Sequence, residues 1–455
     1  MEMTAKPATG CQFCHQGVSS IPYSPASVPP GIMATSQLPQ LTRRTLLRLG
    51  MAGLLIGLCS WRRARLKITS YLHHWRTRRI SVAIPLTAAW AGGVSATEAM
   101  VKVRFPAEVI PHLNLTAGDG APPLRVEAAE VSRSCGVATY ILKSLWPDTD
   151  YTYEVCFAAS SGSPCTGSFR TLPLGPKSFS FAFSSCAATG SSHAVFTTIR
   201  KRRPLFFLHL GDLHYEDIRQ DDPSAFHAAY DAVLGSPTQS ALYRSTALAY
   251  LWDDHDYGAD GGDRHSLTRL AARAAYRDYI PHHPLPGEGT DAPIYQAFTA
   301  GTMRFILLDC RSERSSVRLG DGPRKTLLGE PQKRWLKEEL RAAAGKFRLV
   351  MIASSVPWVG QASSHLDDSW AGYATERAEL ADFIVAVGLE GRVCMLCGDA
   401  HMLAADGGAN SGYARGGKGG MPVWHGSSLD KSSSPKGGPY SEGVYLPKKR
   451  EGCFG

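Results

Sequence analysis

Six short apolar runs in the part of the chain after Pro176 constrain its fold more than any other feature. They cover residues 179–185, 205–210, 247–252, 303–309, 347–353 and 392–397. Most of the intervals between them can hold a crossover helix, and one helix is predicted from Pro331 to a stop signal at Gly345. Apolar runs that alternate with helical segments are typical of a buried parallel or mixed sheet. The sequence therefore predicts an α/β domain over residues 178–455.

Side chains that commonly bind metal ions follow four of these runs. They are Cys186, Asp212 with Tyr215, Asp254 with His255, and Asp399 with His401. Side chains at the carboxyl ends of neighbouring strands converge on the crevice at one edge of an open α/β sheet. The sequence therefore predicts a polynuclear metal site there. Such a set of acids, imidazoles, a thiol and a phenol indicates metal-assisted hydrolysis, with a hard anion such as phosphate as the guest.

The donor types also indicate which ions to expect. The carboxylates of Asp212 and Asp254 suit hard cations, and a carboxylate can bridge two ions about 3.5–4 Å apart. The thiolate of Cys186 and the phenolate of Tyr215 favour Fe(III) over an alkaline-earth ion. Taken singly, Cys186 could equally be a small buried apolar residue and Tyr215 a packing aromatic. The prediction therefore depends on the whole set of residues.

Residues 80–172 show a different pattern, in which apolar and polar residues alternate, as in 99–105 and 151–157. This alternation, with Gly and Pro clusters between the runs, predicts a β-sandwich of the fibronectin or immunoglobulin type. The segment from Leu145 to Tyr151 resembles the tyrosine corner of such modules, in which the hydroxyl contacts the backbone a few residues upstream. The cysteines have no regular spacing, but Cys135, Cys156 and Cys165 lie close enough in sequence for one local disulfide.

Residues 1–79 form a basic leader. They hold 11 of the 49 Lys and Arg residues and only Glu2 of the 40 acidic ones, so the rest of the chain is close to neutral. The near-neutral body presents no nucleic-acid surface by charge, and no feature implies a protein partner. Arg43 and Arg44 precede a short apolar stretch, which resembles a twin-arginine export signal and predicts an exported protein. The alternatives are a short anchor that contacts a membrane surface through its basic flanks, and an organellar location.

Eight motifs, together with the region that opens at Trp90, resemble the PhoD-type alkaline phosphatase family, a branch of metallophosphoesterase-like enzymes. The motifs are Ser185-Cys186, Gly211-Asp212-x-x-Tyr215, Trp252-Asp-Asp-His-Asp-Tyr-Gly258, Tyr276-Arg-Asp-Tyr-Ile-Pro281, Leu308-Asp-Cys-Arg-Ser312, Ser354-Ser-Val-Pro-Trp358, Gly398-Asp-Ala-His-Met-Leu403 and Gly437-Gly-Pro-Tyr-Ser441. The resemblance implies a β-sandwich ahead of a metallophosphoesterase-like α/β sandwich domain that carries the catalytic site.

The resemblance also implies a set of ligands and cofactors. It implies Fe(III) held by Cys186, Asp212 and Tyr215, with Ca(II) beside it, although other divalent ions could take these places. It further implies that Asp254, Asp399 and His401 belong to the same cluster. The chain departs from the family pattern at Asp260, which stands where the family has an Asn thought to contact metal or phosphate. A carboxylate at that position would hold a cation well and repel a phosphate dianion.

Together these patterns predict hydrolysis of phosphate esters by a metal-activated hydroxide. His255 is expected to protonate or stabilise the leaving alkoxide. Arg311 is expected either to clamp the phosphate or to form a structural ion pair, and His214 and Trp358 are expected to line the pocket. Two other functions stay open: a catalytically weak phosphate-binding or adhesive protein, and a phosphodiesterase.

Overall fold

The computed structural model describes residues 87–455, apart from positions 106–108, 119, 158–164, 288, 290, 362–366, 427 and 449–450. All of these residues belong to the second of the two units into which the chain divides, Ser81–Gly455. The predicted leader and its twin-arginine-like signal lie outside the described residues. Among the helices that are described, none is long and apolar enough to cross a membrane.

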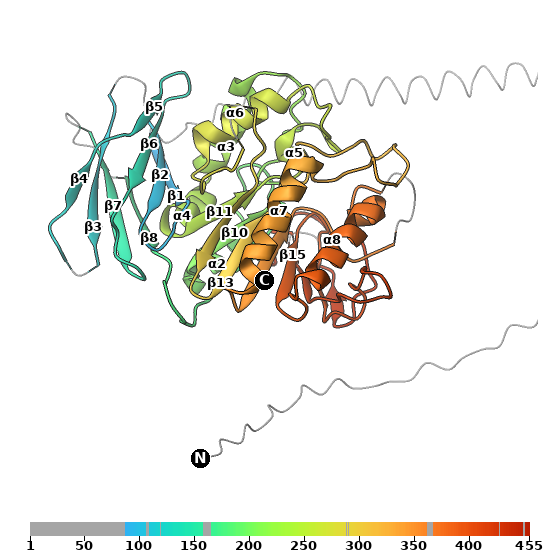
Figure 1. Ribbon diagram of the computed structural model, residues 1–455. Helices are drawn as coiled ribbons and strands as arrows, with labels where there is room; N and C mark the ends of the chain where they lie inside the picture. Colours follow the sequence, from blue (N-terminus) through green and yellow to red (C-terminus); the bar gives the residue numbers. More distant parts are fainter. Residues whose placement is uncertain are drawn as a thin grey trace, which may run out of the picture. The chain divides into compact units, whose positions relative to one another are not determined.

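Two seven-stranded sheets form the centre of the second unit (Figure 1). In spatial order the first sheet consists of β5 (Glu130–Ser132), β6 (Val137–Leu142), β2 (Ala99–Arg104), β1 (Ala88–Gly92), β11 (Ala247–Leu251), β10 (Phe206–Leu210) and β9 (Ala182–Ser184). The second sheet consists of β12 (Gln296–Ala300), β13 (Met303–Leu307), β14 (Leu349–Ser354), β15 (Val393–Cys397), β17 (Val423–His425), β16 (Leu403–Asp406) and β18 (Gly443–Tyr445). Parallel pairing joins β9, β10, β11 and β1 in the first sheet and β13, β14, β15 and β17 in the second.

A smaller sheet and a set of helices complete this unit. The smaller sheet is antiparallel and consists of β4 (Leu124–Val126), β3 (His112–Ala117), β7 (Asp150–Cys156) and β8 (Cys165–Arg170). The helices are α2 (Ala194–Arg202), α3 (Pro223–Gly235), α4 (Pro237–Ser245), α5 (Asp254–Tyr257), α6 (Arg269–Tyr279), α7 (Gly329–Ala344), η1 (Trp370–Tyr373) and α8 (Ala374–Ala386).

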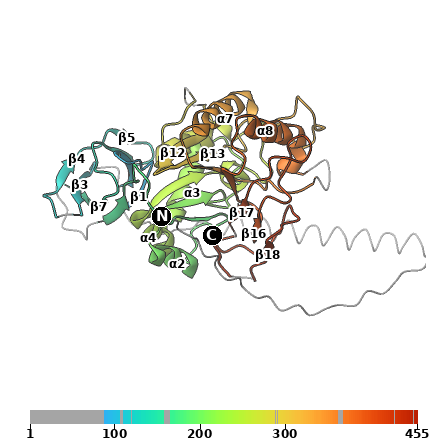
Figure 2. The ribbon, with the colours of Figure 1, turned by 60° about the horizontal axis from the view of Figure 1, so that its bottom comes forward.

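The alternation of side chains along the strands explains the layers. Phe206 and Leu208 of β10 point into a core that also holds Phe305 of β13, so this core lies between the two large sheets. Phe207 points the other way and packs in the core beneath α2, α3, α4 and α6. A third core lies between the second sheet and helices α7 and α8. Figure 2 shows α7 and α8 on one side of the strands and α2 and α4 on the other. The mixed α/β fold that the sequence predicts is confirmed.

The individual elements also follow the sequence closely. Each of the six apolar runs contains a strand, namely β9, β10, β11, β13, β14 and β15. The predicted helix corresponds to α7, which begins two residues before Pro331 and ends immediately before Gly345. These predictions succeed because the period of the apolar residues and the start and stop signals are local properties of the sequence.

The strands before residue 172 share their packing with the α/β part. Strand β1 pairs with β11 at Gly92 and Leu248, where a Cβ atom on Gly92 would lie 2.5 Å from the carbonyl oxygen of Leu248. The core between the two large sheets also contains Tyr153 of the small sheet. The hydroxyl of Tyr151 accepts a hydrogen bond from the backbone N–H of Trp146 at 2.8 Å, which confirms the tyrosine corner. The division into domains at 80–172 and 178–455, and the immunoglobulin-like character of the first, stay predictions.

The local disulfide that the cysteine spacing allowed is not formed, because Cys135, Cys156 and Cys165 are all free. Val155 is the cross-strand partner of Cys165. Successive side chains of a strand point to opposite faces, so Cys156 points away from the face that Cys165 shares with Val155.

Candidate metal centre

The predicted ligands lie at the carboxyl ends of four strands. Cys186 follows β9, Asp212 follows β10, Asp254 begins α5 three residues after the end of β11, and Asp399 follows β15. Three of these residues have a left-handed backbone, with φ of +62° at Cys186, +57° at Asp212 and +62° at Asp399. This conformation is uncommon for residues other than glycine, and it persists only where the surrounding structure imposes it. The backbone therefore turns sharply at three of the four strand ends.

The first group of side chains joins Cys186, Asp212 and His401. One ligand atom from each of them lies within 4.8 Å of the other two. The Cys186 thiol donates to Asp212 Oδ2 at 3.4 Å, and the Tyr215 hydroxyl donates to the same oxygen at 2.7 Å. The Tyr215 hydroxyl also lies 3.2 Å from His401 Nε2. A thiol, a phenol, an imidazole and a carboxylate thus meet around one point.

The second group joins Asp212, Asp254 and His255, again with ligand atoms within 4.8 Å of one another. Asp212 belongs to both groups. Its Oδ1 is buried and accepts no hydrogen bond from any described residue. Burial, followed by the charge of Asp254, raises the pKa of Asp212 well above its usual value. A buried carboxylate oxygen without a donor is costly unless a cation binds it, so the carboxylates of Asp212 and Asp254 fit a pair of metal ions that share Asp212.

The turn after β11 is held by the third residue of the Asp254-His255-Asp256 triplet. Asp256 accepts the backbone N–H of Leu213 at 2.8 Å and that of Asp253 at 2.6 Å. It thereby ties the loop after β10 to the start of α5. Asp254 in turn accepts the backbone N–H of Gly261 at 2.7 Å.

Arg311 lies in the middle of the carboxylates. Its side chain is fully buried, its Nε donates to Asp253 Oδ1 at 2.5 Å, and its Nη2 lies 3.7 Å from Asp254 Oδ1. Burial opposes the ionisation of Asp254, but Arg311 and His255 outweigh it and hold the pKa of Asp254 below its usual range. Arg311 therefore forms structural ion pairs, which were one of the two roles expected for it from the sequence. Arg311 Nη1 has no hydrogen-bond partner among the described residues.

His255 is oriented by Asp217, whose Oδ1 lies 2.6 Å from His255 Nδ1. The imidazole ring also lies close to the ring of Tyr215, with 4.0 Å between the ring centroids. Burial would lower the pKa of His255. The hydrogen bond with Asp217 and the charges of Asp212 and Asp254 outweigh burial and raise the pKa to about 9. The acidic neighbours of His255 therefore favour the protonated form of its imidazole.

Asp399 contacts a cation of the chain itself. The ammonium group of Lys436 donates to Asp399 Oδ1 at 2.6 Å and to Oδ2 at 2.8 Å. Burial of Lys436 opposes its charge, but Asp399 outweighs that effect and raises the pKa of the ammonium group. The structure therefore places the Asp399 side chain against Lys436, next to the two ligand groups rather than inside either of them.

Asp260 lies beside Asp254 and is exposed. Partial burial and then the charge of Asp254 raise the pKa of Asp260. His214 and Trp358 were expected to line the pocket of the site, but both side chains are buried in the protein interior. His214 is 0% exposed and its ring packs against Tyr230, and Trp358 is buried in the core beneath α7 and α8.

Three residues at this site were not predicted from the sequence: Asp217, Asp253 and Lys436. Asp217 stands two residues after Tyr215, and Lys436 directly precedes the Gly437-Gly-Pro-Tyr-Ser441 motif. Their proximity to predicted residues along the chain was the available signal. It does not distinguish a residue that faces the site from one that faces solvent.

Solved structures show the class of fold. A structure of PhoD superposes with a TM-score of 0.64 at 20% identity, over 75% of this chain and 76% of that one. The purple acid phosphatase PPD1 from yellow lupin (Lupinus luteus) seeds superposes with a TM-score of 0.52 at 13% identity, over 80% of this chain and 68% of that one. The fold is thus similar to that of two phosphatases.

The family follows from the sequence comparison. The model of the PhoD-like phosphatase family matches residues 181–424, and the chain belongs to this family. Alkaline phosphatase D of Bacillus subtilis (strain 168) is 27% identical in an alignment 311 residues long that covers 56% of this chain. The chain spans about half the length of that relative, 52%.

Proposed function

We propose that the protein is a metal-dependent phosphoric ester hydrolase. The observation that carries the proposal is the position of Asp212, which belongs to two ligand groups and whose buried Oδ1 has no donor among the described residues. A carboxylate in this position can hold both ions of a two-metal site that hydrolyses phosphate esters. Membership of the PhoD-like phosphatase family supports the same reaction.

We assign Fe(III) to the group of Cys186, Asp212 and Tyr215, and Ca(II) to the group that contains Asp254. The thiol and the phenol on the first side suit a softer and more oxidised ion, and the carboxylates on the second side suit a hard ion. When bound, such ions polarise the phosphoryl oxygens and activate water. His401, 3.2 Å from the Tyr215 hydroxyl, completes the donors on the first side.

His255 supplies the proton for the leaving alkoxide. The hydrogen bond with Asp217 raises the pKa of the imidazole and so favours its protonated form, as a general acid requires. Asp217 holds Nδ1 at 2.6 Å and so leaves Nε2 as the nitrogen that can face a substrate. His255 is thus the proposed acid, and Asp217 is a positioning residue.

The two remaining cations prepare the site for an anion. Arg311 forms an ion pair with Asp253, and Lys436 forms one with Asp399. They reduce the negative charge that a phosphate dianion meets when it enters. Arg311 Nη1 is the one nitrogen of this pair without a described partner, so it is the proposed contact to a phosphate oxygen.

The test uses a chromogenic phosphomonoester, the corresponding diester and metal analysis of the purified protein. We expect Asp212→Asn to lose bound metal and to lose activity by more than about 100-fold, since even residues that only orient a metal ligand contribute 10–100-fold. Asp231→Asn is the matched control, because Asp231 is also buried but pairs with Arg104. Full activity of Asp212→Asn would overturn the proposal.

A catalytically weak phosphate-binding protein is the second candidate, and Asp260 is the observation that favours it. Its carboxylate lies beside Asp254, where it adds negative charge to the site. Inorganic phosphate that binds to metal-loaded protein without turnover of either ester would support this candidate and exclude the hydrolase.

A further inference from the structure

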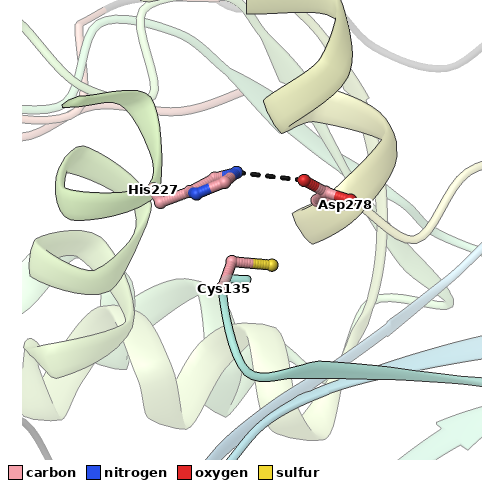
Figure 3. A group of neighbouring side chains, drawn as sticks. All are labelled: Cys135, His227 and Asp278. Carbon is pink, nitrogen blue, oxygen red and sulfur yellow. Dashed lines mark hydrogen bonds and ion pairs between the residues drawn. The ribbon is translucent and has the colours of Figure 1, made fainter. Parts of the chain in front are cut away.

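A second set of metal-type side chains lies outside the candidate metal centre and shares no residue with it. Cys135 belongs to the turn between β5 and β6, His227 to α3, and Asp278 to the last turn of α6. Figure 3 shows the His227 ring directed toward Asp278, with the sulfur of Cys135 next to both. One ligand atom from each residue lies within 4.8 Å of the other two. Three segments that are distant in the sequence therefore converge on one point.

The spacing of these atoms suits a small tetrahedral ion. His227 Nε2 lies 3.0 Å from Asp278 Oδ2. Ligand atoms around Zn²⁺, with bonds of about 2.0–2.3 Å, lie about 3.3–3.7 Å apart in a tetrahedron. The nitrogen and the oxygen would thus separate by a few tenths of an ångström, and the sulfur would approach by a side-chain rotation. Solvent reaches the group, since 13% of the His227 side chain and 29% of the Asp278 side chain are exposed.

The charges around the group leave its anionic members available for a metal ion. Lys102 Nζ donates to Thr139 Oγ1 at 2.7 Å and to the carbonyl oxygen of Arg277 at 2.8 Å. Arg104 Nε pairs with Asp231 at 3.1 Å. The neighbouring cations therefore have partners of their own. Burial raises the pKa of the Cys135 thiol, so the thiol ionises readily only when a cation binds it.

We propose that Cys135, His227 and Asp278 form a Zn²⁺ site that joins the β5–β6 turn to helices α3 and α6. A thiolate, an imidazole and a carboxylate are the three ligand types that zinc uses in proteins, and the thiolate excludes calcium and magnesium. Three protein ligands leave a fourth position for water. Because the ligands come from three segments, the ion stabilises the folded chain more than the unfolded one.

The first experiment follows each thiol separately. The purified full-length protein is treated with iodoacetamide with and without added Zn²⁺, and the labelled peptides are quantified by mass spectrometry. Zinc should protect Cys135 from labelling, because the ion occupies the sulfur electron pair that attacks the reagent. Cys156, a free and partly exposed thiol of the small sheet, is the internal control and should label at an unchanged rate. Equal labelling of Cys135 with and without zinc would overturn the proposal.

The second experiment counts zinc by equilibrium dialysis. The native protein should bind one equivalent more than Cys135→Ser, whereas Cys156→Ser should bind as much as the native protein. Zinc should also raise the Tm of the native protein and of Cys156→Ser more than that of Cys135→Ser. His227→Gln is the second variant, in case Cys135→Ser does not fold. Equal zinc content and an equal shift of Tm in native protein and His227→Gln would contradict the site.

Discussion

Asp217 offers the sharpest test of the proposed acid, because it acts on the reaction only through His255. The pKa of His255 is about 9, against a usual value of 6.5. A hydrogen bond to a charged group is worth about 1.5–3 kcal/mol, and one pKa unit corresponds to about 1.4 kcal/mol, so the bond alone could account for about one to two units. Asp217 is 41% exposed, and screening by water favours the lower end. We therefore expect Asp217→Asn to lower the pKa of His255 by about one unit.

The sign of the effect on activity follows from this shift. A general acid must be protonated, so kcat/KM falls as the pH rises through the pKa of the free enzyme's acid. The alkaline limb of the pH profile should move about one unit toward lower pH in Asp217→Asn, while the rate at its plateau changes little. The substitution is tolerated by the backbone, since Asp217 has φ of +48° and Asn adopts this conformation readily.

Two controls make the result decisive. Glu216→Gln removes the same charge one residue away and should leave the alkaline limb in place. An NMR titration of the His255 imidazole in the native protein and in Asp217→Asn measures the pKa directly. An alkaline limb that stays fixed in Asp217→Asn would refute the assignment of His255 as the acid oriented by Asp217.

Three further predictions concern the metals, the charge at the site and the leader. The protein as isolated should be coloured, because phenolate and thiolate donors to Fe(III) give charge-transfer absorption. Tyr215→Phe should alter that absorption band. Active, colourless protein that contains zinc and no iron would contradict this prediction. Asp260→Asn should lower the inhibition constant for inorganic phosphate, by less than about tenfold because water screens an exposed carboxylate. An unchanged inhibition constant together with unchanged metal content would place Asp260 outside the site. Protein that begins near Ile80 should be soluble and as active as the full chain, since every proposed ligand follows residue 180; loss of solubility or activity would show that the leader is needed.

The sequence predicted those features whose signals are local. Strands β10 and β15 are visible as apolar runs of the right length, and α7 has a proline in its first turn and Gly345 after its end. The strand ends likewise identified Asp212 and Asp254, because residues that follow parallel strands meet at one edge of a sheet. These inferences need no knowledge of which side chains touch.

Other features depend on contacts between distant segments, which a single sequence does not reveal. Nothing near Asp399 indicates that Lys436 would bind it, and nothing near Cys135 indicates that helix α3 would bring His227 beside it. His214 stands between two predicted ligands, yet its side chain points into the core next to Tyr230. In each case the direction of the side chain is decided by tertiary packing, whereas the sequence gives only its position along the chain.

The pairing of β1 with β11 has a consequence for how the protein is made. During synthesis Gly92 leaves the ribosome long before Leu248, its partner across the two strands. Until β11 emerges, β1 has an unpaired edge, and the apolar residues of the shared core, such as Tyr153, lack part of their covering. The first strands therefore cannot complete their fold as the chain grows, although domains often do so one after another. A nascent chain of this kind has a long interval in which a chaperone that binds apolar segments would be of use.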